Sequence, residues 1–193
     1  MKRPAGVRVV PVTDDRWADL ETLFGARGAC GGCWCMWPRL PRKVFEQQKG
    51  EPNRKALRAR VHDGPPPGLL AYIDGVPAAW CAVGPRQEFV RLARSVAALP
   101  EAVEPVWSIV CLFVARPYRR QGLSAVLIEH AVRFAKAHGA RLIEGYPVEP
   151  QSGSLPDAFA WTGLPSAFER AGFTEVARRS PSRPIMRRVL RKS

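Results

Sequence analysis

A short basic stretch with one glycine separates an apolar run from an amphipathic one near the middle of the chain. Its residues are Arg119, Arg120, Gln121, Gly122, Leu123 and Ser124. If a helix begins here, its first N–H groups have no partner within the helix, and the helix dipole favours an anion at that end. Gly122 can adopt a positive φ and has no Cβ to obstruct a phosphate, while the arginines add positive charge. The stretch predicts a pocket for a phosphorylated cofactor, although a solvated basic turn between a strand and a helix fits the spacing equally well.

The elements on either side of this stretch are predicted from hydrophobic spacing. Residues 106–114 contain one polar residue, Ser108, among β-branched, aromatic and other apolar residues, which is typical of a strand buried on both faces. Beyond the stretch, apolar residues recur at steps of three and four, namely Leu123, Val126, Leu127, Ala131 and Phe134. This spacing predicts an amphipathic helix that stops at Gly139. The basic stretch therefore lies between the end of a buried strand and the first turn of a helix.

These residues resemble the acyl-CoA-binding motif of the GNAT superfamily of N-acetyltransferases. In that motif, Arg or Gln is followed by two residues, Gly, one residue, and Gly or Ala. Ser124 stands at the last position here, a departure that slightly crowds the loop. A second segment, 168–173 with the sequence FERAGF, resembles the helix that closes the family's fold and the Gly-Phe that opens its next strand. The two segments lie at the family's usual separation.

The predicted elements follow the order β-α-α-β-β-β-α-β-α-β-β. This order predicts an α/β chain, of α+β mixed type, with a mixed central sheet of six to seven strands and helices on both faces. It is also the element order of the GNAT fold, so the resemblance extends loosely to the whole chain. A length of 193 residues and an apolar content of 46% fit one domain over residues 1–193. Locally, we expect a helix capped by Thr13, a short helix over 88–98, and two strands joined by Asp74 and Gly75.

The charge of the chain is concentrated at one end. The net charge is +13, and seven basic residues but no acidic one lie in the C-terminal strand and tail, 178–193. Without these seven charges the rest of the chain carries +6, which is unexceptional. Such a segment could contact nucleic acid or acidic surfaces. The alternative is a basic edge strand over 185–190, whose charges discourage pairing with another sheet.

Composition excludes other classes of protein and site. No stretch approaches the roughly 20 apolar residues of a membrane span, and residues 1–15 lack the apolar core of a signal peptide. We therefore expect a cytoplasmic location and no membrane partner. Five cysteines in such a chain favour free thiols over a disulfide framework. Three of them, Cys30, Cys33 and Cys35, lie close together, but a structural zinc site usually has four ligands, so we expect no metal.

The resemblance implies acetyl-CoA as cosubstrate. In the GNAT superfamily, the strand before the glycine loop splays from its neighbour, and the pantetheine arm of the cofactor pairs with the exposed backbone. By this resemblance, the cofactor-binding residues are Leu112, Phe113, Val114, Arg119, Arg120, Gln121, Gly122, Leu123, Ser124 and Phe168. Val114 or a neighbour is the expected N–H donor to the thioester carbonyl. The family often has Tyr at the position of Phe168, where it protonates the leaving thiolate.

Phe168 has no proton to give, so the acid, like the base, must be another group. Tyr146, at the end of the next predicted strand, is a candidate acid, or it packs at the strand end. A thiol with a pKa of ~8.5 also leaves as thiolate without help. Glu149 is our first choice of base because it follows the carboxyl end of that strand, where the clefts of α/β sheets open. Other carboxylates near the expected cleft, each alternatively a solvated surface acid, are Glu88, Glu144 and Asp157.

A loop rich in cysteine and tryptophan is predicted over residues 25–41. In the GNAT superfamily this region often forms the acceptor wall, which would make Trp34, Met36 and Trp37 an apolar lining and Arg39 a cation for an anionic group. Trp80 and Trp107 lie on neighbouring predicted strands that could face one cleft. The predicted substrate-binding residues are Trp34, Met36, Arg39, Trp80, Arg86 and Trp107. They indicate a small amphiphilic acceptor, unless the aromatic residues only cover the sheet's open face.

These observations predict an acyl-CoA-dependent N-acetyltransferase that moves an acetyl group from acetyl-CoA to a primary amine of a small-molecule acceptor by direct attack. The alternative is a nucleic-acid-binding or regulatory module with a degenerate acyl-CoA site, favoured by the basic segment, the cysteines and Phe168. An intermediate hypothesis is an enzyme that acetylates proteins and uses the basic segment to bind an acidic partner. Under the first hypothesis the partner is an amine acceptor and nucleic acid is not expected. The sequence leaves a homodimer open.

Overall fold

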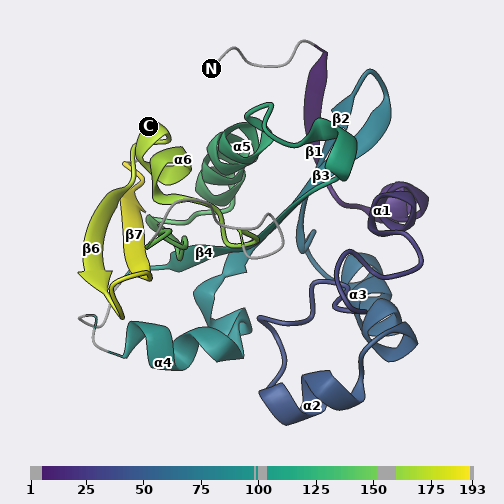
Figure 1. Cartoon of the computed structure of the whole chain (residues 1–193), viewed down its shortest axis with the longest axis horizontal. Coiled ribbons are helices and arrows are strands. Elements are labelled where there is room, and N and C mark those ends of the chain that lie inside the picture. Colours follow the sequence, from purple (N-terminus) through teal and green to yellow (C-terminus); the bar gives the residue numbers. More distant parts are fainter. Residues whose placement is uncertain (1–5, 98, 100–103, 152–159, 192–193) are drawn as a thin grey trace.

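The computed structural model describes residues 6–97, 99, 104–151 and 160–191, which form a twisted sheet with helices on both faces (Figure 1). The strands are β1 (Val7–Pro11), β2 (Gly68–Ile73), β3 (Val76–Pro85), β4 (Val106–Val114), β5 (Leu142–Gly145), β6 (Thr174–Arg178) and β7 (Pro184–Val189). The α-helices are α1 (Trp17–Phe24), α2 (Arg42–Gln47), α3 (Glu51–Asp63), α4 (Ala93–Val96), α5 (Leu123–Ala137) and α6 (Pro165–Arg170). Short 3₁₀ helices are η1 (Asp14–Arg16), η2 (Arg86–Glu88), η3 (Val90–Leu92) and η4 (Arg116–Tyr118).

The sheet is mixed. Its strand order is β1-β2-β3-β4-β5-β7-β6. Among the described strands, β4 and β5 run parallel and every other neighbouring pair is antiparallel. A seven-stranded mixed sheet with helices on both faces confirms the predicted fold class.

Each face of the sheet has its own buried core. α5 and α6 cover one face, where Leu127 and Phe168 are fully buried. α1, α3 and the loop 25–41 cover the other face, where Leu57 and Trp80 are fully buried. In Figure 1, α5 and α6 lie together beside β7, whereas α1, α2 and α3 lie together on the right of the view. The apolar stripe of α5 predicts this arrangement, because a helix buries its apolar face against the sheet.

Several local predictions are confirmed. β4 has the predicted bounds, and α5 begins at Leu123 and ends just before Gly139, whose φ is 82°. β2 and β3 form the predicted hairpin, in which Asp74 has a φ of 48° and Gly75 a φ of 81°. Two consecutive residues with positive φ are what a type I′ hairpin turn requires.

Other local predictions are wrong. Residues 88–98 do not form one helix, because Phe89 adopts an extended backbone (φ −109°, ψ 78°) between η2 and η3. Thr13 is the N-cap residue of the helical segment that begins with η1 and continues as α1 to Phe24, but its hydroxyl donates to the side chain of Asp15 at 2.5 Å and makes no capping bond to the backbone. The basic strand β7 lies between β5 and β6, so its charges protect no sheet edge, and β6 is the edge strand.

β4 is bent in its middle by a β-bulge. In its register with β3, Cys111 is opposite Ala82 and Ile109 is opposite Val83, so Val110 is an extra residue on β4. The pairing of β4 with β5 also ends at Ile109, opposite Gly145. The bulge therefore separates the paired half of β4 from residues 110–114, whose outer edge is not paired with β5.

Candidate active site

The basic stretch forms the loop that joins β4 to α5. Arg120 has a φ of 62° and Gly122 a φ of 83°, so the backbone passes twice through the left-handed region before the helix begins. Within the described parts of the chain, no backbone carbonyl accepts a hydrogen bond from the N–H groups of residues 121–124. Arg119 ties the loop to the end of β4, since its Nε donates to the carbonyl of Val114 at 3.1 Å. N–H groups of this kind at a helix N-terminus are well suited to bind a phosphate.

The gap between the diverging ends of β4 and β5 contains a segment of the chain itself. On the β4 side, the N–H of Leu112 donates to the carbonyl of Trp161 at 2.6 Å. On the β5 side, the N–H of Val148 donates to the carbonyl of Gly163 at 3.0 Å. Residues 160–163, which we call the bridging segment, therefore connect the two strand ends through one backbone hydrogen bond on each side.

The bridging segment packs on the ring of Phe168. Gly163 has a φ of 83°, and a Cβ at this position would lie 2.9 Å from Cε2 of Phe168 and 3.0 Å from Cδ1 of Leu112. A Cβ on Gly145, at the end of β5, would overlap the same ring. Phe168 is fully buried. Phe168 therefore forms the floor of the gap, and the two glycines allow the backbone to approach it closely.

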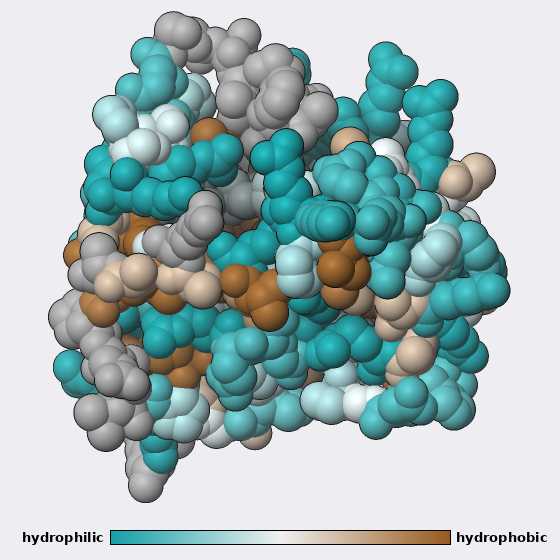
Figure 2. All heavy atoms as spheres, turned by 90° about the horizontal axis from the view of Figure 1, so that it is seen from below, coloured by the Kyte–Doolittle hydropathy of each residue, from teal (hydrophilic) through white to brown (hydrophobic). Residues whose placement is uncertain are grey.

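A cavity of about 480 Å³ lies beside the bridging segment. Its aromatic lining residues are Trp37, Tyr146 and Trp161, and its basic ones are Arg91, Arg179 and Arg183. Among the described residues that line it, none is acidic. α4, which contributes Ser95 to the lining, lies on the face seen in Figure 2, where apolar atoms show between hydrophilic side chains. The cavity thus combines apolar walls with positive charge, next to the open edge of β4.

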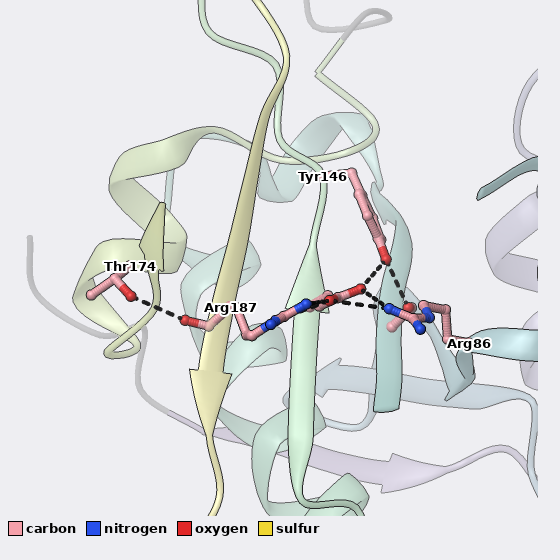
Figure 3. Close-up of polar contacts among 6 residues, drawn as sticks. Arg86, Tyr146, Thr174 and Arg187 are labelled. Atoms are coloured by element: carbon pink, nitrogen blue, oxygen red, sulfur yellow. Dashed lines mark hydrogen bonds and ion pairs between the residues drawn. The ribbon is translucent and has the colours of Figure 1, made fainter. Parts of the chain in front are cut away.

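Tyr146 connects the cavity to a buried ionic network (Figure 3). Its hydroxyl donates to Oε2 of Glu144 at 2.7 Å, and Glu144 is fully buried on β5. Arg187 of β7 donates to Oε1 of Glu144 at 2.7 and 3.0 Å, and Arg86 lies 3.4 Å from both carboxylate oxygens. Ser108 of β4 lies 3.0 Å from the tyrosine hydroxyl. The network therefore ties β4, β5 and β7 together at one wall of the gap.

Both of the predicted proton-transfer residues are engaged elsewhere. Burial, and then the charge of Glu144, raise the pKa of Tyr146 well above its ordinary value, and its proton already points at Glu144. Glu149 forms an ion pair with Arg178 and is not among the described residues that line the cavity. Asp157 lies outside the described residues. The structure therefore brings Tyr146 to the site, although not as a proton donor with a free hydroxyl, and leaves Glu149 outside it.

The predicted substrate-binding aromatic residues do not gather in one pocket. Trp34 and Met36 are buried in the core, where Trp34 stacks on Trp17. Trp80 and Trp107 belong to the cores on opposite faces of the sheet, so the prediction that they face one cleft is wrong. Of the predicted apolar lining residues in the loop 25–41, Trp37 does line the cavity.

The two predicted substrate-binding cations are both paired with carboxylates of the protein. The side chain of Arg39 is 3% exposed and pairs with Glu88 at 2.5 Å. Burial, and then the charge of Arg60, lower the pKa of Arg39 to about 10. Arg86 pairs with Glu144. Arg86 also lines a second cavity, of about 560 Å³, together with Trp107, whereas Arg39 is closed off from an acceptor by its burial.

The cysteines are free thiols. The sulfur atoms of Cys35 and Cys111 lie 3.2 Å apart, and the indole N–H of Trp80 donates to the sulfur of Cys35 at 2.7 Å. Burial raises the pKa of Cys33 to about 11, which keeps this thiol protonated at neutral pH. Across the described ranges, no group of three or more His, Cys, Asp or Glu side chains is arranged to hold a metal ion.

The basic C-terminal segment uses most of its described arginines within the fold. Arg178 and Arg187 pair with carboxylates, and Arg188 donates to the carbonyl of Ala171 at 2.5 Å. Arg179 and Arg183, in the turn between β6 and β7, face the cavity. These contacts weaken the main argument for a nucleic-acid-binding surface.

The bridging segment and the arginines of the cavity were not among the residues predicted from the sequence. The sequence does hold a signal for the segment, because no element is predicted in the long stretch between Tyr146 and the helix of segment 168–173, and loops of such length in compact domains are often functional. Arg179 and Arg183 were seen only as part of a charge run. Nothing in the pattern around Arg91 indicates its place, which depends on the packing of η3 against the loop 25–41.

Comparison with known proteins assigns the family. The model of the acetyltransferase (GNAT) family matches residues 34–154, which is more than half of the chain. No curated protein sequence matches the chain significantly. Within the described ranges, no helix is long and apolar enough to cross a membrane.

Solved structures show the same fold at low identity. The PaiA N-acetyltransferase of Thermoplasma acidophilum in complex with coenzyme A has a TM-score of 0.53 and 14% identity, over 95% of this chain and 99% of that one. The polyamine N-acetyltransferase of Drosophila melanogaster, which catalyses the formation of N-acetylagmatine, has a TM-score of 0.57 and 13% identity, over 95% and 100%. A GNAT-family acetyltransferase of Listeria monocytogenes has a TM-score of 0.57 and 13% identity, over 95% of each chain. Because the family model and the fold agree, the chain belongs to the acetyltransferase (GNAT) family.

Proposed function

We propose that this protein is an N-acetyltransferase that moves an acetyl group from acetyl-CoA to the primary amine of a small-molecule acceptor. The observation that carries the proposal is the loop before α5, where the N–H groups of residues 121–124 meet no backbone carbonyl within the described chain. This loop follows a strand whose edge diverges from its neighbour. Membership of the GNAT family supports acyl-CoA as the donor. The relatives whose structures hold coenzyme A or that acetylate polyamines support a CoA thioester and a small amine as the reactants.

The diphosphate of the cofactor is assigned to the loop. The N–H groups of residues 121–124 and the positive end of α5 favour a double negative charge there. Arg120 adds a cation, and the absence of a Cβ on Gly122 leaves the approach clear. The pantetheine arm is assigned to the open edge of β4, where Leu112 and Val114 point their N–H groups to the same side because they are two residues apart.

The bridging segment must leave the gap when the arm of acetyl-CoA enters. The N–H of Leu112, which we assign to the thioester carbonyl, is held by the carbonyl of Trp161. One N–H cannot serve two carbonyls at full strength, so the carbonyl of Trp161 occupies the place that we assign to the thioester. The apparent affinity for acetyl-CoA is therefore reduced by the fraction of molecules in which the segment stays in the gap.

In the proposed reaction, neither the predicted acid Tyr146 nor the predicted base Glu149 transfers a proton. The neutral amine attacks the thioester carbon, a C–N bond forms, and the C–S bond breaks. The N–H of Leu112 stabilises the negative charge that develops on the carbonyl oxygen. Because no described carboxylate lines the cavity, we assign the amine proton to solvent, and a thiol with a pKa of ~8.5 leaves as thiolate. Tyr146 acts as a positioning residue, since its hydroxyl is held by Glu144.

Thermal unfolding with and without ligand tests the donor. Acetyl-CoA at about one hundred times its Kd stabilises the folded state by about 2.7 kcal/mol, which raises the Tm by about 5–10 °C for a chain of this size. Coenzyme A should act similarly and ATP should not. Release of the free thiol in the presence of amines then tests transfer. If neither acetyl-CoA nor coenzyme A raises the Tm, the proposed function is wrong.

A further inference from the structure

The cavity beside the bridging segment is lined by arginines and, among the described residues, by no carboxylate, although Glu46 acts on the charge of Arg91 from outside the lining. Arg91, Arg179 and Arg183 line it. Each donates a hydrogen bond to a neutral oxygen, and the acceptors are, in the same order, the carbonyl of Leu40 at 2.9 Å, the hydroxyl of Ser95 at 3.2 Å and the hydroxyl of Thr162 at 3.3 Å. Among the described residues, none of the three forms an ion pair with a carboxylate. Water screens the charges of the exposed Arg179 and Arg183, and an anion between the three guanidinium groups would interact favourably with all of them.

Arg91 lines the cavity with a buried N–H donor that has no acceptor within the described chain. Its guanidinium lies 3.6 Å from the centre of the Trp37 ring, and its Nη2 is buried with no hydrogen-bond partner within the described chain. Burial, and then the charge of Arg42, lower the pKa of Arg91. A buried donor without an acceptor is unfavourable, and an anionic oxygen in the cavity removes that penalty.

Several buried arginines elsewhere in the molecule form ion pairs with carboxylates. Arg39 pairs with Glu88, and Arg86 and Arg187 pair with Glu144. Each of these three largely buried arginines therefore has a carboxylate partner, although the fold also holds Arg188 through the carbonyl of Ala171. The absence of a carboxylate from the described lining of the cavity is a local feature of that site.

We propose that the acceptor carries an anionic group, a carboxylate or a phosphate, on the same small molecule as its primary amine, and that Arg91, Arg179 and Arg183 bind that group. This inference rests on the proposed function and names its acceptor class. A volume of about 480 Å³ fits a small molecule, with the aromatic side chain of Trp37 as one wall. Since Val110 lines the cavity and lies on β4 two residues before Leu112, the amine of an acceptor held by the arginines lies on the side of the thioester.

The acceptor class is tested with short primary amines that differ in the charge of their other end. β-Alanine and O-phosphoethanolamine carry an anion there, ethanolamine is neutral, and putrescine is a second cation. With acetyl-CoA saturating, we expect the kcat/KM of the better anionic amine to exceed that of ethanolamine by at least about tenfold, and putrescine to be the poorest acceptor. Comparison of β-alanine with O-phosphoethanolamine shows whether carboxylate or phosphate is the anion.

The double variant R179A/R183A tests whether the arginines cause this preference. Both residues are exposed in the turn between β6 and β7, so we expect the variant to fold. The kcat/KM of the anionic amine should fall by about a hundredfold, while that of ethanolamine stays within about threefold. The matched control is R27A/R133A, which removes two exposed arginines outside the cavity and should leave both values unchanged. Arg183→Lys keeps the charge without the planar fork and should give an intermediate loss.

Calorimetry with O-phosphoethanolamine measures the anion site without turnover. If acetyl transfer occurs but ethanolamine or putrescine is preferred, or if R179A/R183A leaves the preference unchanged, the inference is wrong and the proposed function stands. If no amine is acetylated but O-phosphoethanolamine binds to the wild type and not to R179A/R183A, the anion site stands and the proposed function is wrong. Absence of both transfer and binding overturns both.

Discussion

The two ends of the proposed cofactor site differ in whether their backbone N–H groups are available to a ligand. At the phosphate end, the loop 119–124 already holds its N–H groups in position, and within the described chain no backbone carbonyl occupies those of residues 121–124. At the acyl end, the N–H of Leu112 is bound to the carbonyl of Trp161. One end of the site is therefore preformed, and the other is covered by the chain.

The difference follows from where each set of N–H groups lies. Groups at a helix N-terminus can face water, which satisfies them until a phosphate arrives. Groups on the edge of a strand inside a sheet lie among apolar side chains, where an unpaired N–H is unfavourable. Leu112 is 5% exposed and rests on the floor formed by Phe168. The bulge at Val110 opens this edge, and the bridging segment satisfies it.

The largest expected effect concerns the wall that keeps the acyl end in shape. Glu144→Gln removes the carboxylate shared by Arg86 and Arg187 and leaves two largely buried guanidinium groups without their counter-charge. We expect the free energy of unfolding to fall by about 3–5 kcal/mol, measured by urea denaturation. The control Glu46→Gln, in an exposed pair with Lys49, should change it by less than about 0.5 kcal/mol. Equal effects of the two variants would show that the network does not hold the wall.

The next effect concerns the preformed end. Gly122→Ala places a Cβ at a φ of 83°, which is unfavourable by about 1–2 kcal/mol, and the loop relaxes by turning its N–H groups apart. We expect calorimetry to show acetyl-CoA binding at least about tenfold weaker. Gly139→Ala is a matched control, because Gly139 has a φ of 82° and a Cβ there would meet no atom within 4 Å. It should lower the Tm and leave the Kd unchanged. An unchanged Kd for Gly122→Ala would contradict the assignment of the phosphate site.

The covered end should respond in the opposite direction. Gly163→Ala has the same backbone penalty at a φ of 83°, and its Cβ would press on Phe168 and Leu112. This change destabilises the bridging segment in the gap, so acetyl-CoA displaces it more easily, and we expect the Kd to fall by about fivefold. Weaker binding by Gly163→Ala would mean that the segment supports the cofactor instead of standing in its place.

The smallest expected effect concerns Tyr146, at the boundary between the gap and the cavity. Because burial and Glu144 hold its pKa well above the ordinary value, the hydroxyl stays protonated as the pH rises to about 10. The kcat/KM for the acceptor should therefore rise as the amine loses its proton and show no descending limb below that pH. Tyr146→Phe should lower kcat by less than about tenfold, because the hydroxyl is occupied by Glu144. A descending limb below pH 10 that disappears in Tyr146→Phe would establish Tyr146 as the acid.

Local patterns in the sequence predicted the fold and the preformed end. Hydrophobic spacing places β4 and α5 at their observed bounds, and the basic stretch between them predicts the loop with Gly122 at positive φ. These features depend on residues that are close together in the chain. For the same reason the hairpin at Asp74 and Gly75 was predictable.

The covered end and the acceptor cavity could not be predicted in this way. The contact of Trp161 with Leu112 joins residues about 50 positions apart, and the arginines of the cavity come from η3 and from the turn after β6. The predicted cations Arg39 and Arg86 have the right charge, but their carboxylate partners Glu88 and Glu144 are brought to them only by the sheet. Spacing along the chain does not show which charges the fold neutralises.

A crystal structure of the protein with coenzyme A would show both ends of the cofactor site at once. We expect the diphosphate to accept hydrogen bonds from the N–H groups of residues 121–124. We also expect the arm to lie along β4, with the carbonyl of Trp161 no longer on the N–H of Leu112. Coenzyme A bound away from this loop, or bound there while Trp161 still contacts Leu112, would contradict this expectation.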